Sequence, residues 1–199
     1  MQELRADRAG AEAIKAFAIY GDRTALEPYG SGHINDTFAV TFDQGGNNMR
    51  YILQRINHQI FRDVHRLMSN VQRVCAHAHR KLADADCPDA SRRALNLVPT
   101  WEGNPFHQDA SGHFWRVYLF IEGAVGYDVV QTPQQAYEAA RAFGEFQRLM
   151  VDLPGERLYE TIPDFHQTRK RFSALLQVLD ADCQNRAQSC RAEIDWALA

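Results

Sequence analysis

A hairpin pattern between residues 37 and 56 limits what this chain can fold into more than any other feature of its sequence. Phe38, Val40 and Phe42 alternate with small or polar residues, and a second strand-like run covers residues 51–56. The residues between the two runs, QGGNN at 44–48, are typical of a turn. Because alternation with a period of two places every second side chain on one face of a strand, the pattern predicts a β-hairpin with one apolar face.

The hydrophobic period changes to three and four residues after this hairpin. The apolar residues that recur at this spacing are Val64, Leu67, Met68, Val71, Cys75, Ala78 and Leu82. Such a spacing forms a single apolar stripe on a helix, and Asp63 is placed to cap the first turn. The sequence therefore predicts a long amphipathic helix over residues 64–82.

Three further elements are predicted before residue 122. Residues 11–19 carry apolar side chains at helical spacing, and Gly21 supplies a stop. Residues 95–101 and 114–121 are apolar and aromatic runs that read as a second hairpin, with DASG at 109–112 as its turn.

Only helices are predicted after Ile121. Thr132, Pro133 and Gln135 combine an N-cap, a proline at the first helical position and a capping-box glutamine. Asp164 is expected to open another helix, and residues 193–199 a last one. The expected fold class is α+β, with an antiparallel sheet and long helix over residues 1–121, a linker over 122–131 and helices over 132–199.

Composition excludes several classes of partner. The 22 Lys and Arg against 25 Asp and Glu give a net charge of −3, and no basic stripe suggests nucleic acid. The four cysteines are widely spaced, which is typical of reduced thiols rather than of a disulfide or zinc framework. Neither a signal peptide nor a membrane-spanning run is recognisable, so we expect a cytoplasmic protein without a membrane partner.

A glycine-rich segment lies where two strands are expected to meet. Glycines allow the backbone to approach a phosphate, and small polar side chains there donate hydrogen bonds. The candidate residues are Gly30, Ser31, Gly32, His33, Asn35, Asp36 and Thr37. The segment is neither a Walker loop nor a dinucleotide fingerprint, and an ordinary glycine turn is the alternative.

The end of the next strand supplies polar groups. Ile52 and Gln54 share one face, and Arg55 lies on the other. Gln54 occupies the position at which a kinase strand holds its phosphate-contacting lysine, whereas Arg55 is the nearest cation, so either is a candidate. No glutamate occurs between Asp63 and Leu82 to pair with such a cation, and Asn70 is the candidate polar partner instead.

These segments, in this order, resemble a known family. The stretches that carry the likeness are YGSGHINDTFAV, YILQRINHQIF, LMSNVQRV, FWRVYLFIEG and ERLYETIPDFHQTRKRF. They resemble the N-acetylhexosamine 1-kinase-like branch of the aminoglycoside phosphotransferase superfamily, from about Tyr29 to about Asp182. The resemblance implies a protein-kinase-like fold that uses ATP and Mg²⁺ to phosphorylate the anomeric hydroxyl of a sugar. It also implies that Phe120, Ile121 and Glu122 form the adenine hinge.

The catalytic part of that family is missing from these residues. A His-x-Asp motif followed by an Asn, and a second Asp, are expected after the hinge, but the one His-x-Asp, at 107–109, precedes it and reads as a turn. We therefore expect the N-terminal portion of a kinase, with no catalytic or metal-binding residue of its own. The alternatives are a non-catalytic nucleotide- or partner-binding protein that self-associates through its exposed helices, and a kinase for choline, homoserine or an aminoglycoside.

Overall fold

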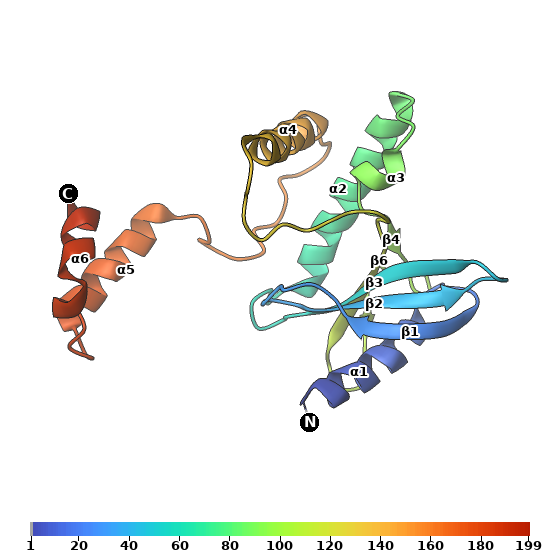
Figure 1. The fold of residues 1–199 in the computed structure, drawn as a ribbon, viewed down its shortest axis with the longest axis horizontal. Coiled ribbons are helices and arrows are strands. Elements are labelled where there is room, and N and C mark those ends of the chain that lie inside the picture. Colours follow the sequence, from blue (N-terminus) through green and yellow to red (C-terminus); the bar gives the residue numbers. More distant parts are fainter. Residues whose placement is uncertain (1) are drawn as a thin grey trace. The chain divides into compact units, whose positions relative to one another are not determined.

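The computed structural model describes residues 2–199. Contacts divide the chain into two compact units, one ending at Thr161 and the other covering Ile162–Ala199. The first unit contains the whole sheet, and Figure 1 shows its strands between helices α1 and α2. The fold class is α+β, as predicted.

The sheet has six antiparallel strands in the order β1-β2-β3-β6-β4, with β5 paired to β6 outside this path. The predicted hairpin is confirmed as β2 (Asp36–Asp43) and β3 (Asn48–Ile56). The strand expected before the glycine-rich segment, for which the sequence indicated no bounds, is β1 (Asp22–Pro28), which pairs with β2 and is exposed along most of its length. An exposed edge strand lacks the apolar alternation by which strands are recognised.

One sheet face packs against the N-terminal helix. Helix α1 (Gln2–Ala13) passes into the short helix η1 (Ile14–Ala16), and both lie on the face that carries Leu53 and Trp115. The helix predicted over residues 11–19 is wrong at both ends. Phe17 takes an extended backbone, is buried, and bridges to Thr100, so tertiary pairing ends the helix before Gly21.

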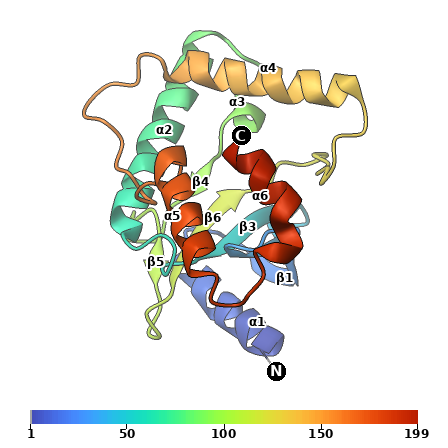
Figure 2. The same ribbon diagram turned by 90° about the vertical axis from the view of Figure 1, so that its left-hand side faces the viewer.

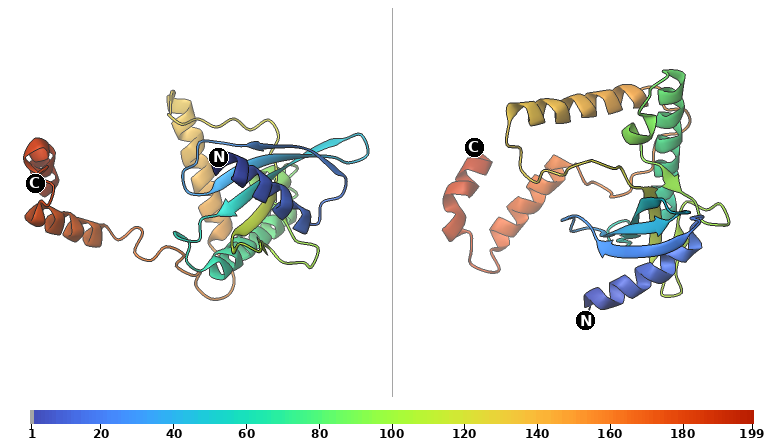
Figure 3. Two further views of the ribbon diagram at one scale, coloured as in Figure 1. Left: turned by 90° about the horizontal axis from the view of Figure 1, so that it is seen from below. Right: turned by 45° about the vertical axis from the view of Figure 1, so that its right-hand side comes forward.

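The opposite face packs against α2 (Val64–Asp84), as two views in Figure 3 help to show. The predicted cap is confirmed, because the Asp63 carboxylate accepts a hydrogen bond from the Arg66 N–H at 2.9 Å. Ile56 of β3 and Met68 of α2 are fully buried together in this second core. The sheet therefore has an apolar core on each side.

The second predicted hairpin is only partly right. Residues 95–101 contribute the two-residue strand β4 (Leu97–Val98), which pairs with β6 (Phe114–Leu119). The 109–112 turn instead joins β6 to a strand not predicted, β5 (His107–Gln108). A short helix, α3 (Ala90–Arg93), was also missed.

Helix α4 (Pro133–Met150) begins with the predicted capping box between Thr132 and Gln135. In Figure 2 it crosses near the C-terminal end of α2. His77 Nε2 of α2 lies 3.0 Å from the Leu149 carbonyl oxygen, and Lys81 pairs with Asp152 at 2.7 Å. These contacts place α4 in the same compact unit as the sheet, while the predicted functional boundary at residues 122–131 stays a prediction.

The second unit consists of α5 (Thr168–Ala181), the short helix η2 (Gln188–Cys190) and α6 (Arg191–Leu198). The final helix was predicted, but the start at Asp164 is wrong. Asp164 has a φ of 61°, a left-handed conformation that cannot lead directly into a helix, and α5 begins after Gln167. Among residues 2–199, no helix is long and apolar enough to cross a membrane.

Candidate functional site

The glycine-rich segment forms a loop from the end of β1 to the start of β2. The Tyr29 N–H donates to the Thr37 carbonyl oxygen at 2.8 Å, which closes the base of the loop. Gly30 has a φ of 80°, where a side chain would be strained. No atom lies within 4 Å of where a Cβ would stand on Gly30 or Gly32, so the backbone is open to a ligand there. The Ser31 hydroxyl contacts the Asp128 carboxylate at 3.2 Å.

Two predicted loop residues, Asn35 and Asp36, bind to residues at the end of β3, so their side chains are already engaged within the protein. The Asn35 side chain accepts a hydrogen bond from the Asn57 N–H at 3.0 Å, and Asp36 forms an ion pair with Arg55. A pocket of about 320 Å³ lies at this end of the sheet. It is lined by His33, Ile34, Asp36, Arg55, Ile56, Asn57, His58, Gln59 and His113.

A row of polar side chains crosses three adjacent strands from the end of the loop. Thr37 of β2 lies opposite Gln54 of β3, which in turn lies opposite Arg116 of β6. The Gln54 amide donates from Nε2 to the Thr37 hydroxyl at 3.0 Å, and its Oε1 accepts from Arg116 Nε at 3.1 Å and Nη2 at 3.0 Å. The row therefore connects the glycine loop to a cation in the middle of the sheet.

Gln54 and Arg55 lie on different faces of the sheet. Gln54 reaches Arg116, whose Nη1 is 3.8 Å from the Met68 sulfur of α2, so Gln54 lies on the α2 face together with Ile52 and Ile56. Arg55 alternates to the other face, where Asp36 neutralises its charge. Gln54, and not Arg55, therefore belongs to the polar row, which ends in the Arg116 guanidinium.

Burial shapes the electrostatics around Arg116. Removal from water lowers the pKa of Arg116, because the charged guanidinium loses hydration. The guanidinium lies 5.2 Å from the centre of the Tyr118 ring. Burial also raises the pKa of Tyr118 to about 12 and raises the pKa of the Cys75 thiol. The phenol and the thiol are therefore neutral groups beside the guanidinium at neutral pH.

The predicted hinge residues begin where β6 ends. The Phe120 N–H donates to the Arg50 carbonyl oxygen at 3.0 Å, and the Phe120 ring lies between the Arg50 guanidinium, 3.9 Å away, and the Tyr29 ring at 5.3 Å. Arg50 also forms an ion pair with Glu122, and hydrogen bonding from Arg50 lowers the pKa of that carboxyl. Phe120 and Glu122 are therefore both held by Arg50, and Ile121 lies between them in the chain.

Sequence reasoning missed two residues of this arrangement and misplaced a third. Arg116 is the only charged residue within β6, whose sequence is FWRVYL. A charge inside an otherwise apolar strand is the sequence signal that could have identified it as a candidate. Tyr29 joins the loop to the hinge through Phe120. The assignment of Asn70 as a polar partner for the β3 group is wrong, because its amide exchanges hydrogen bonds with the Tyr159 backbone at 2.8 and 3.0 Å.

The interpretation of the His-x-Asp at 107–109 as a turn is only partly right, because His107 and Gln108 form strand β5 and only Asp109 belongs to the 109–112 turn. Asp109 accepts hydrogen bonds from the Ser111 and His113 N–H groups and from the indole of Trp115 at 2.8 Å. Burial alone would raise the pKa of Asp109, but these hydrogen bonds outweigh it and lower the pKa. The carboxylate therefore stabilises the β5–β6 connection. Among the side chains described, those of residues 8–199, no group of three His, Cys, Asp or Glu residues is arranged to hold a metal.

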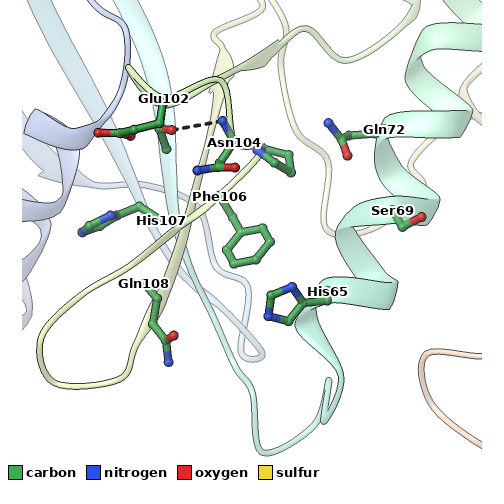
Figure 4. A pocket seen from close by; sticks show the side chains of 10 residues that line it. His65, Ser69, Gln72, Glu102, Asn104, Phe106, His107 and Gln108 are labelled. Carbon is green, nitrogen blue, oxygen red and sulfur yellow. Dashed lines mark hydrogen bonds between the residues drawn. The ribbon is translucent and has the colours of Figure 1, made fainter.

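A separate pocket of about 450 Å³ lies between α2 and the segment from Thr100 to Gln108 (Figure 4). His65, Ser69 and Gln72 line it from α2, and the Asn104 N–H donates to the Thr100 hydroxyl at 3.1 Å on the other side. It contains none of the residues predicted for the nucleotide loop, the β3 position or the hinge. This pocket is therefore separate from the candidate site.

An antiparallel sheet with a glycine loop over its first strands and a long helix on the face below defines a kinase-like N-lobe, here followed by helices. Comparison with known families agrees with this class, because residues 25–199 match the phosphotransferase enzyme family. The chain therefore belongs to this family of small-molecule phosphotransferases within the protein-kinase-like superfamily. Members of the family generally use ATP and Mg²⁺.

Proposed function

We propose that this chain is the nucleotide-binding portion of an ATP-dependent kinase. The observation that carries the proposal is the polar row of Thr37, Gln54 and Arg116, which starts at the end of an open glycine loop and ends in a half-buried cation. An anionic ligand is the natural complement of such a row. The phosphates would lie against the loop, and the adenine would lie beside Phe120–Glu122.

The proposed reaction is phosphoryl transfer to the anomeric hydroxyl of a sugar such as an N-acetylhexosamine. This choice of acceptor is supported by the likeness of the quoted sequence stretches to the N-acetylhexosamine 1-kinase-like branch. Phosphoryl transfer depends on an oriented acceptor and on Mg²⁺ held by acidic ligands. Residues 123–199 contain no His-x-Asp motif for that role, so we propose that this chain alone binds nucleotide without turnover.

Titration of the chain with fluorescently labelled ATP tests the proposal. Wild-type protein is expected to bind saturably, with a dissociation constant near the millimolar range because Mg²⁺ ligands are lacking. A Gln54→Leu variant removes the hydrogen bonds that position Thr37 and Arg116, and the loss of about one well-placed hydrogen bond to the phosphates, about 0.5–1.5 kcal/mol, should lower the affinity roughly tenfold. The neighbouring Arg55→Leu variant, on the opposite face, should weaken binding less.

Two results would contradict the proposal. Absence of saturable binding at millimolar ATP would remove the nucleotide site altogether. Equal affinity in wild-type, Gln54→Leu and Arg55→Leu proteins would show that nucleotide binds elsewhere. Circular dichroism of each variant is needed as a control, because a loss of folding would also abolish binding.

A further inference from the structure

Arg116 is held in the sheet by neutral groups alone. Its neighbours along β6, Trp115 and Val117, are fully buried on the α1 face, while the guanidinium points to the α2 face. There it donates two hydrogen bonds to the Gln54 amide oxygen and contacts the Met68 sulfur. An amide and a thioether satisfy donors without neutralising charge.

Among the side chains described, which are those of residues 8–199, no carboxylate forms an ion pair with the Arg116 guanidinium. Arg50, Arg55 and Arg141 each pair with an acidic side chain, whereas Arg116 forms no ion pair in this part of the chain. A half-buried cation without a counter-charge is costly, and its lowered pKa reflects the same loss of hydration. An anion bound beside this guanidinium would supply the missing counter-charge.

We infer that Arg116 of β6 binds the phosphate groups of the nucleotide. It would thereby take the role that kinases give to a lysine on the strand equivalent to β3, which is the neighbour of β6. This inference rests on the proposed function. The residue at the lysine position, Gln54, carries no charge, and its amide is occupied on both sides by Thr37 and Arg116. Gln54 is thus a positioning residue that holds the guanidinium toward the end of the glycine loop.

The inference is tested by comparing a charged and a neutral ligand. Arg116→Met keeps an unbranched apolar stem of similar length but removes the charge. We expect its affinity for ATP and ADP to fall about 10- to 100-fold, as for loss of a hydrogen bond to a charged group, while its affinity for adenosine stays within twofold of wild type. Arg141→Met is the matched control, because Arg141 is exposed on α4 and pairs with Glu138 and Glu145.

Relocating the charge provides a second test. In the double variant Gln54→Lys with Arg116→Met, a lysine occupies the usual β3 position and the β6 cation is gone. We expect this protein to recover at least tenfold of the ATP affinity lost in Arg116→Met, without a change for adenosine. A purely structural role of Arg116 in holding β3 against α2 predicts no such phosphate-specific recovery.

The outcomes separate this inference from the function on which it rests. If wild-type protein binds ATP but Arg116→Met binds it equally well, the inference is wrong and the proposed function stands. If the folded variant loses ATP and adenosine alike, Arg116 is structural and the inference is also wrong. If wild-type protein binds neither ligand, both fail.

A measurement on wild-type protein covers the case in which Arg116→Met does not fold. Phenylglyoxal modifies accessible arginines, and mass spectrometry of the peptide containing Arg116 gives its rate of modification. ATP should slow modification of Arg116 at least several-fold, whereas adenosine should not. Equal rates with and without ATP would overturn the inference.

Discussion

The sheet and the helix α4 show two different ways in which this chain acquires secondary structure. In the sheet, Leu53 and Trp115 are completely buried, and neighbouring strands share apolar cores on both faces. Helix α4 has no buried residue, and Phe143 is 71% exposed, yet its capping box is formed as the sequence indicates. Local sequence signals thus suffice to start a helix. Burial shows that the sheet, in contrast, is stabilised by contacts between residues distant in the sequence.

The largest effect should come from the sheet core, and two tryptophans make the comparison direct. Trp115 is 0% exposed and Trp196 is 84% exposed. Trp115→Ala should cost about 3–5 kcal/mol in free energy of unfolding, because it leaves a cavity and removes a hydrogen bond to Asp109. Trp196→Ala should change it by less than about 0.5 kcal/mol. Urea unfolding followed by circular dichroism measures both, and similar losses would contradict the contrast.

An intermediate effect is expected from the exposed apolar side chains of α4. Phe143 and Phe146 are exposed to water in the described part of the chain. Burying each side chain in an interface between two copies would contribute about 1.5–3 kcal/mol to the free energy of association. We therefore expect concentration-dependent self-association that a Phe143→Ser, Phe146→Ser variant weakens by at least tenfold. Analytical ultracentrifugation measures this, with Tyr137→Ser as a control at another exposed position of the same helix. A wild-type chain that stays monomeric at high concentration would rule it out.

The smallest effect concerns Arg50 and Glu122, where the sheet passes into the irregular segment before α4. Arg50 lowers the pKa of Glu122 below its usual 4.5, so the pair stabilises the folded state above that pH and the contribution is lost as the pH falls through the lowered pKa. NMR titration should show the lowered pKa in wild-type protein and a return toward 4.5 in Arg50→Gln. An unchanged pKa in the variant would show that Arg50 does not cause the shift.

Much of the fold was predictable because it depends on neighbours in sequence. The β2–β3 hairpin, the Asp63 cap of α2, the 109–112 turn and the Thr132 capping box are each specified within a few residues. The failures have a different cause. Helix η1 ends because Phe17 pairs with Thr100, and α5 starts late because the backbone at Asp164 is left-handed.

The sequence by itself determined the β2–β3 hairpin and the long helix after it, the position of the glycine loop and the likeness that points to the phosphotransferase family. Only the tertiary structure decided which polar groups meet, because the partner of a side chain on a strand depends on register with strands far away in the sequence. Gln54 and Arg116 are 62 residues apart, yet they share a hydrogen bond because β3 and β6 are neighbours in register. Pairing with Asp36 likewise depends on the register of β2 and β3, and it leaves Arg55 on the other face of the sheet from Gln54.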